Sequence, residues 1–78
     1  MVAKILGMGC SKCQTLEAKV REVAGKNNID VTVEKVTELA KIQAYRVMMT
    51  PALVVDEVVK AYGRIPKEDE ILKWLKGE

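Results

Sequence analysis

The sequence predicts an α/β fold, in which a mixed four-stranded sheet of strand order 2-1-3-4 has helices on both faces. Three observations predict it. Short apolar runs and segments with helical spacing follow one another in the order β-α-β-α-β-β-α. The opening β-α-β unit makes the first two strands parallel, with a right-handed crossover. The first and third strands are almost wholly apolar, as central strands are, whereas the other two alternate, as edge strands do.

The first strand is expected at Val2–Leu6, where Lys4 is the one polar residue. Gly7 and Gly9 follow this strand closely, and glycines at this spacing predict a flexible turn. The turn leads directly into a segment with helical spacing, so the chain is expected to pass from strand to helix here.

The first helix is expected from Ser11, because apolar residues then recur about every 3.6 positions. Those residues are Cys13, Leu16, Val20, Val23 and Ala24. Gly25 is the expected residue just past the end of the helix, with 26–28 forming the loop beyond it.

A strand with one buried face is expected over 29–36, because apolar and polar residues alternate there. Thr37 is a suitable N-cap for a second helix, which is expected to run to Tyr45 or Val47. The helix cannot continue to Pro51, because the residue before a proline avoids helical backbone angles.

The run Ala52–Val55 is short and wholly apolar, which suits a central strand. Asp56 and Glu57 form a tight connection to a strand at Val58–Tyr62, although they are not the Asn-Gly or Asp-Gly pair that a hairpin prefers. Pro66 then opens a last helix, whose first turn is acidic and so complements the helix dipole. Its apolar stripe consists of Ile71, Leu72 and Leu75, with Trp74 beside it.

The two cysteines of the chain, Cys10 and Cys13, stand three residues apart where the first strand passes into the first helix. At such a junction this spacing is typical of a redox pair. Residues three apart share one helix face, with Cβ atoms about 5–6 Å apart, and a small distortion brings them to the roughly 3.8 Å of a disulfide. The amide groups and dipole of a helix start also favour a thiolate, the reactive form of cysteine. We therefore expect a disulfide that forms and breaks reversibly.

Three motifs carry a resemblance to a known family: Cys10-Ser-Lys-Cys13, Thr50-Pro51 before the third strand, and Tyr62-Gly63 after the fourth. With the order of elements, they resemble the small thioredoxin- and glutaredoxin-like redox proteins of prokaryotes, often archaeal. The resemblance covers the whole chain and implies a minimal thioredoxin fold, as a single domain over 1–78. It implies that Cys10 attacks a substrate disulfide, that Cys13 resolves the mixed disulfide, and that a cis Pro51 faces the site.

The resemblance also implies an activity, a protein-disulfide oxidoreductase or electron carrier that reduces or exchanges protein disulfides without a cofactor or metal. Its partners would be disulfide-containing proteins and a thioredoxin-reductase-like electron donor. The implied docking surface consists of Met8, Gly9, Ser11, Lys12, Met49, Thr50, Pro51, Tyr62 and Gly63.

The chain departs from the family pattern around these motifs. The aromatic residue and the proline that surround the cysteines of typical thioredoxins are replaced by Gly9 and by Ser11-Lys12. The paired glycines and acidic residue with which glutaredoxins hold glutathione are absent, which argues against glutathione as a bound cofactor. Many thioredoxins carry a buried acid six residues before the first cysteine, where this chain has Lys4. We expect Lys4 to extend its stem to water and to have no acid–base role.

Copper delivery is the alternative function. Residues 7–13 also fit the Gly-Met-x-Cys-x-x-Cys loop of copper-binding ferredoxin-like domains, and two thiolates suit the soft Cu(I) ion. Those domains run β-α-β-β-α-β and end in a strand, whereas this chain is expected to end in a helix. A closed structural zinc site would need four ligands, and the chain has two cysteines and no histidine. A plainer interpretation, two small buried residues at a helix start, explains the glycine-rich junction less well.

The composition argues against several other classes of function. The net charge is +2 with both signs interspersed, without the basic block of nucleic-acid-binding proteins. No apolar run is long enough to cross a membrane, and the apolar stretch near the first residue is too short for a secretory signal. Two cysteines are too few for a secreted disulfide scaffold. We therefore expect a cytoplasmic monomer with no nucleic-acid or membrane partner.

Overall fold

The structure, a computed structural model that describes residues 1–9 and 11–77, has the architecture that the sequence predicts. Its elements are β1 (Val2–Leu6), α1 (Ser11–Lys26), β2 (Thr32–Val36), α2 (Leu39–Ala44), β3 (Ala52–Val55), β4 (Val58–Tyr62) and α3 (Glu68–Leu75). The strand order is β2-β1-β3-β4, with β1 parallel to β2 and antiparallel to β3, and β4 antiparallel to β3. The predicted fold class, element order and strand order are confirmed.

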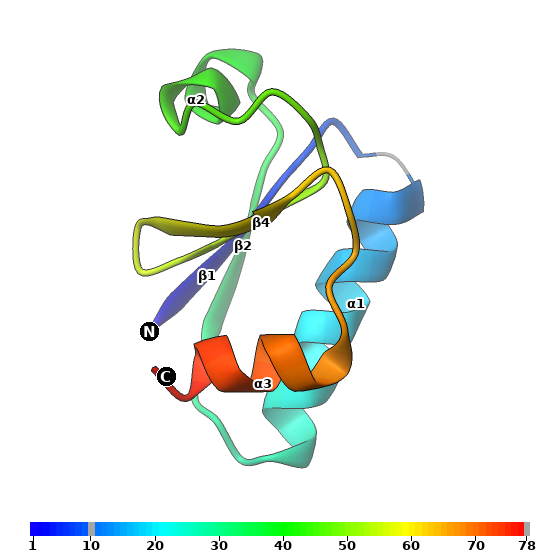
Figure 1. Ribbon diagram of the computed structural model, residues 1–78, viewed down its shortest axis with the longest axis vertical. Helices are drawn as coiled ribbons and strands as arrows, with labels where there is room; N and C mark the ends of the chain where they lie inside the picture. Colours follow the sequence, from blue (N-terminus) through cyan, green and yellow to red (C-terminus); the bar gives the residue numbers. More distant parts are fainter. Residues whose placement is uncertain (10, 78) are drawn as a thin grey trace.

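Helices cover both faces of the sheet, with α1 and α3 packed together on one face and α2 on the other (Figure 1). Because successive strand residues point to opposite faces, β1, β2 and β3 each contribute to two apolar clusters. The α1/α3 face buries Ala3, Ile5, Leu16, Val20, Val23, Ala24, Leu53, Val55, Ile71 and Leu75. The α2 face buries a smaller set, Leu6, Ile42, Val47, Ala52 and Val54. The central position of β3 explains why all four of its residues are buried.

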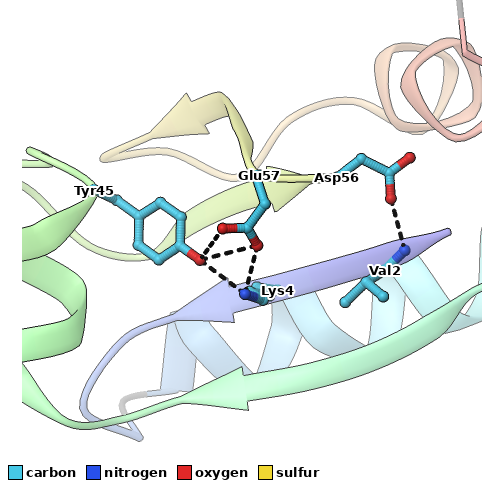
Figure 2. Close-up of polar contacts among 5 residues, drawn as sticks. All are labelled: Val2, Lys4, Tyr45, Asp56 and Glu57. Carbon is cyan, nitrogen blue, oxygen red and sulfur yellow. Dashed lines mark hydrogen bonds and ion pairs between the residues drawn. The ribbon is translucent and has the colours of Figure 1, made fainter.

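The β3–β4 hairpin turns through Asp56 and Glu57, whose φ angles are 48° and 70°. Positive φ at both central residues is the conformation that a two-residue type I′ turn requires. Hydrogen bonds tie this turn to the start of β1 (Figure 2). The Val2 N–H donates to Asp56 Oδ1 at 2.9 Å, and the Asp56 N–H donates to the Val2 carbonyl at 2.9 Å. The tight connection predicted from the sequence is thus present without the usual Asn-Gly or Asp-Gly pair.

The end of α1 differs from the prediction, because Gly25 lies inside the helix and does not follow it. The left-handed residue beyond α1 is Asn28, with φ 53°, a conformation that asparagine tolerates better than most residues. The Asn27 side-chain amide donates to a carbonyl of the last turn at 2.8 Å, and the Ile29 N–H donates to another at 2.9 Å. These bonds satisfy carbonyls that the helix end leaves open, so the helix ends without a glycine.

The second strand and second helix are shorter than predicted. β2 begins at Thr32, opposite Val2, although Ile29 and Val31 still pack against the α1/α3 cluster. The predicted N-cap at Thr37 is wrong, because the cap position is Glu38 and its side chain makes no capping bond. No helix in the described part of the chain is both long enough and apolar enough to cross a lipid bilayer.

Candidate redox site

The described part of the cysteine motif and the two other predicted motifs meet at one end of the sheet. Leu6, the last residue of β1, pairs with Ala52, the first residue of β3, and Ala52 pairs with Tyr62, the last residue of β4. The segments just beyond this row are therefore neighbours. The Gly63 N–H donates to the Pro51 carbonyl at 2.9 Å, which extends the β3–β4 ladder by one step. Loops from three strands thus form one surface at this edge.

Cys13 lies in the first turn of α1 and is 6% exposed, with its side chain against the backbone of Gly7. A Cβ atom added at Gly7 would overlap Cys13 Sγ and would lie 3.9 Å from Thr50 Cβ. The sulfur therefore occupies the space that a side chain at position 7 would need. Cys10, the predicted nucleophile, lies outside the described residues; in the sequence it directly precedes Ser11, the first residue of α1.

Replacing Gly7 with alanine should destabilise the protein by about 1–3 kcal/mol, the usual effect of overpacking, because the added methyl group must displace the Cys13 sulfur. Gly25→Ala is the matched control. Gly25 lies within α1 with open space around it, so the same change there should stabilise by about 0.5–1 kcal/mol. Urea unfolding of the reduced proteins measures both effects. A Gly7→Ala variant as stable as the wild type would show that the Cys13 sulfur does not pack against Gly7.

The Thr50–Pro51 peptide bond is cis, and Pro51 is fully buried at the start of β3. The neighbouring Met49 packs against Gly63, which has φ 74°; an added Cβ there would lie 3.1 Å from Met49 Cβ. Met49 and Tyr62 are both exposed on the outer side of this contact. The predicted docking residues of the third and fourth strands are therefore brought together.

A groove of about 560 Å³ lies beside this surface on the α2 face. We call it the α2 groove; its lining includes Met8, Leu39, Ile42, Arg46, Met48 and Thr50. Met48 is 90% exposed, and flexible methionine side chains adapt to varied apolar partners. Ser11 and Lys12, which the resemblance also placed in the docking surface, are exposed at the start of α1 and are not part of this lining.

Known proteins with similar sequences indicate the family. A family model described as the thioredoxin domain matches residues 1–76. The chain belongs to the thioredoxin family. A relative named thioredoxin from Methanothermobacter thermautotrophicus is 37% identical over 75 residues, which cover 96% of this chain and 97% of the relative. Another, named thioredoxin, from Methanocaldococcus jannaschii is 34% identical over 76 residues, covering 97% of this chain and 87% of the relative.

The resemblance to small archaeal thioredoxin-like proteins is therefore confirmed. Membership of the thioredoxin family indicates, in general terms, an oxidoreductase of thiols and disulfides with protein substrates and reductase partners.

Lys4 stands where many members of the thioredoxin family carry a buried acid, and its side chain lies on the α2 face (Figure 2). Its ammonium donates to Glu57 Oε1 at 2.5 Å and to the Tyr45 hydroxyl at 2.8 Å. The Glu57 carboxylate and then the Tyr45 hydroxyl raise the pKa of Lys4 above its ordinary value. Cys13 packs on the opposite face, beside Gly7. Lys4 is therefore a charged residue on the far side of the sheet from Cys13.

Lys4→Gln should leave the pH profile of disulfide reduction nearly unchanged, with at most a small fall in rate. The raised pKa keeps Lys4 protonated throughout the neutral range, so it cannot accept a proton there. Reduction rates measured against pH, with the exposed Lys41→Gln as a control, provide the comparison. A loss of activity together with a displaced basic limb would show that Lys4 titrates in the mechanism.

Two charged residues near Cys13 were missed in the sequence. Glu17 follows Cys13 by four positions, which places both on one face of α1. Lys35 follows Ile29, Val31 and Val33 at every second position, so it lies on the same face of the strand as these apolar residues. A charged residue on that face interrupts the apolar pattern. Both signals lie in the sequence, as a charge four residues after Cys13 and a charge on the apolar face of the second strand.

Proposed function

We propose that this member of the thioredoxin family reduces protein disulfides through a dithiol–disulfide cycle of Cys10 and Cys13. The observation that carries the proposal is the position of Cys13. Its sulfur is shielded against Gly7, at the sheet edge where Pro51 and Gly63 also lie. A shielded thiol three residues after an N-terminal partner suits the resolving role, since it reacts with that partner more readily than with solvent reagents.

The proposed cycle transfers two electrons from the cysteine pair to the substrate. The Cys10 thiolate attacks one sulfur of the substrate disulfide; a Cys10–substrate bond forms, the substrate S–S bond breaks, and the leaving thiolate takes up a proton. Cys13 then loses its proton and attacks the Cys10 sulfur. The Cys10–Cys13 bond forms, the mixed disulfide breaks, and the second substrate thiolate leaves. An external dithiol donor of the reductase class restores the reduced pair.

The proposed partners dock on the surface around the motifs. Met8, Met49 and Tyr62 are exposed beside the site, and the α2 groove extends this apolar area. Such a surface fits an extended protein segment that carries a disulfide and an apolar side chain. The adaptable methionines favour a range of partners over a single one.

Copper delivery is the weaker candidate. The order of elements separates the two functions, because α2 directly follows β2 here, whereas the copper-binding domains run β-α-β-β-α-β. Nothing in the fold or in the family match supports a metal-carrying role over the redox role.

The test is a count of thiols by alkylation and mass spectrometry. Mild oxidation should convert both thiols into one intramolecular disulfide in the monomeric chain, and dithiothreitol should restore both. The reduced protein should then reduce the disulfides of insulin in the presence of dithiothreitol. Addition of Cu(I) to the reduced protein provides the competing measurement. A protein that forms only intermolecular dimers, or no disulfide at all, would refute the redox cycle.

A further inference from the structure

A small cavity of about 110 Å³ lies between the start of α1 and the sheet, on the α1/α3 face. Its lining includes Ile5, Gly7, Cys13, Glu17, Lys35 and Thr37. The lining is mostly apolar but includes the charged residues Glu17 and Lys35. A space of this size with polar groups in its wall is large enough for water. The cavity therefore joins the shielded Cys13 to a carboxylate and an ammonium group.

Glu17 is held at the wall of this cavity by two cations. Its side chain is 15% exposed, although other charged residues of the same helix are exposed. The Glu17 Oε2 atom accepts hydrogen bonds from Arg21 Nε at 3.1 Å and from Arg21 Nη2 at 3.0 Å. The other oxygen forms an ion pair with Lys35 Nζ at 3.3 Å. Lys35 pairs with Ile5 across the β1–β2 ladder, which brings its stem to this face.

The remaining charges near Cys13 point elsewhere or lie farther along the chain. On α1, Lys12 is exposed and outside the lining, and Arg21 lies one turn beyond Glu17. On the strands, Lys4 and its register partner Glu34 line a different pocket, near α2. The neighbouring Thr50-Pro51 segment carries no charge. Among the residues that the structure describes, Glu17 and Lys35 are thus the charged pair that lines the Cys13 cavity.

We propose that the Glu17–Lys35 ion pair sets the acidity of the Cys13 thiol, which makes both of them positioning residues of the redox cycle. The inference rests on the proposed function in one respect, the reason for controlling the acidity of this thiol. In the proposed cycle, Cys13 must stay protonated until the mixed disulfide forms. The Glu17 carboxylate opposes formation of a thiolate beside it, and the Lys35 ammonium favours it. In the paired state the two effects offset one another.

The charge of Glu17 persists over the working pH range. Hydrogen bonds from Arg21 lower the pKa of Glu17 below its ordinary value; Lys35 adds to this, and partial burial of the carboxylate opposes it. Glu17 therefore remains ionised in neutral and mildly acidic solution and acts on Cys13 as a fixed charge. The proton that Cys13 releases passes to water in the cavity or to the departing substrate thiolate.

The test is a titration of Cys13 in the fully reduced, full-length protein, followed by NMR of ¹³Cβ-labelled cysteine. Glu17→Gln should lower the pKa of the Cys13 thiol, because Lys35 is then left without its carboxylate partner. Lys35→Gln should raise it, because the carboxylate is then less neutralised. Glu22→Gln is the matched control: it lies on the same helix, is exposed, pairs with Lys26, and should leave Cys13 unchanged.

Opposite shifts in the two variants, absent from the control, would support the proposal. Shifts of the same sign, no shift, or an equal shift in Glu22→Gln would overturn it. If circular dichroism shows that Glu17→Gln does not fold, the shift in Lys35→Gln alone decides the test. This variant should fold, because the Lys35 side chain is 62% exposed and its replacement should cost little stability. The titration needs no turnover. A protein that fails to reduce disulfides but shows these shifts would refute the proposed function and leave this inference standing.

Discussion

Cys10→Ser should abolish disulfide reduction, whereas Cys13→Ser should still attack a substrate and then stop. A serine hydroxyl at position 10 cannot replace the thiolate as the attacking group, so no mixed disulfide forms and turnover should fall to the background. In Cys13→Ser the first attack proceeds, but no thiol is left to release the substrate. The mixed disulfide should therefore accumulate and be visible on non-reducing gels and by mass spectrometry.

The matched control for these variants is Thr15→Ala. Thr15 is an exposed residue of α1 whose hydroxyl bonds to the Ser11 carbonyl at 3.0 Å, and its loss should leave the reduction rate unchanged. Trapping of substrate by both serine variants to the same extent would contradict the assignment of roles. Residual turnover of Cys10→Ser would contradict it as well.

The largest expected effect on stability is that of Leu53→Ala. Leu53 is fully buried on β3, in the cluster that joins the sheet to α1 and α3. Truncating a buried leucine removes apolar contacts and leaves a cavity, which destabilises by about 2–5 kcal/mol. A chain of this length is stable by roughly 4–12 kcal/mol, at about 0.05–0.15 kcal/mol per residue. The variant should therefore lose a large fraction of the stability of the protein.

Leu39→Ala is the same chemical change at a site that is 56% exposed, so it should alter stability by less than about 0.5 kcal/mol. Urea midpoints of the two variants against the wild type measure the difference. Because Leu39 lines the α2 groove, this variant also tests docking without weakening the core. Equal midpoints for the two variants would mean that β3 is not the centre of the core.

The sequence predicted best what depends on local pattern. The largely apolar run at Val2–Leu6 and the wholly apolar run at Ala52–Val55 indicated which strands lie in the centre, and the crossover rule indicated that the first two strands are parallel. Cys13, Thr50-Pro51 and Tyr62-Gly63 then lie at one sheet edge because the strand register aligns the segments that carry them. For this reason, the fold and the position of Cys13 at the start of α1 could be predicted from the sequence.

The features that the sequence missed depend on contacts between distant segments. Gly25 has a suitable identity for a helix end, but side-chain and backbone bonds from Asn27 and Ile29 cap the helix farther on. The α2 groove forms only when the loop of Met8 meets α2, and neither segment signals this alone. The ion pair of Glu17 with Lys35 likewise joins α1 to β2 across the sheet face. Residue periodicity gives the face of each element but not the partner it meets.

The two faces of the sheet separate two properties of the protein. The α2 groove lies over the smaller cluster, whereas the cavity of Cys13 lies on the α1/α3 face, and only the loops at the sheet edge belong to both. Substitutions in α2 thus alter the surface offered to partners while the charges around the thiol stay in place. Substitutions at Glu17 or Lys35 do the reverse. Partner choice and thiol reactivity can therefore diverge independently in descendants of one small fold.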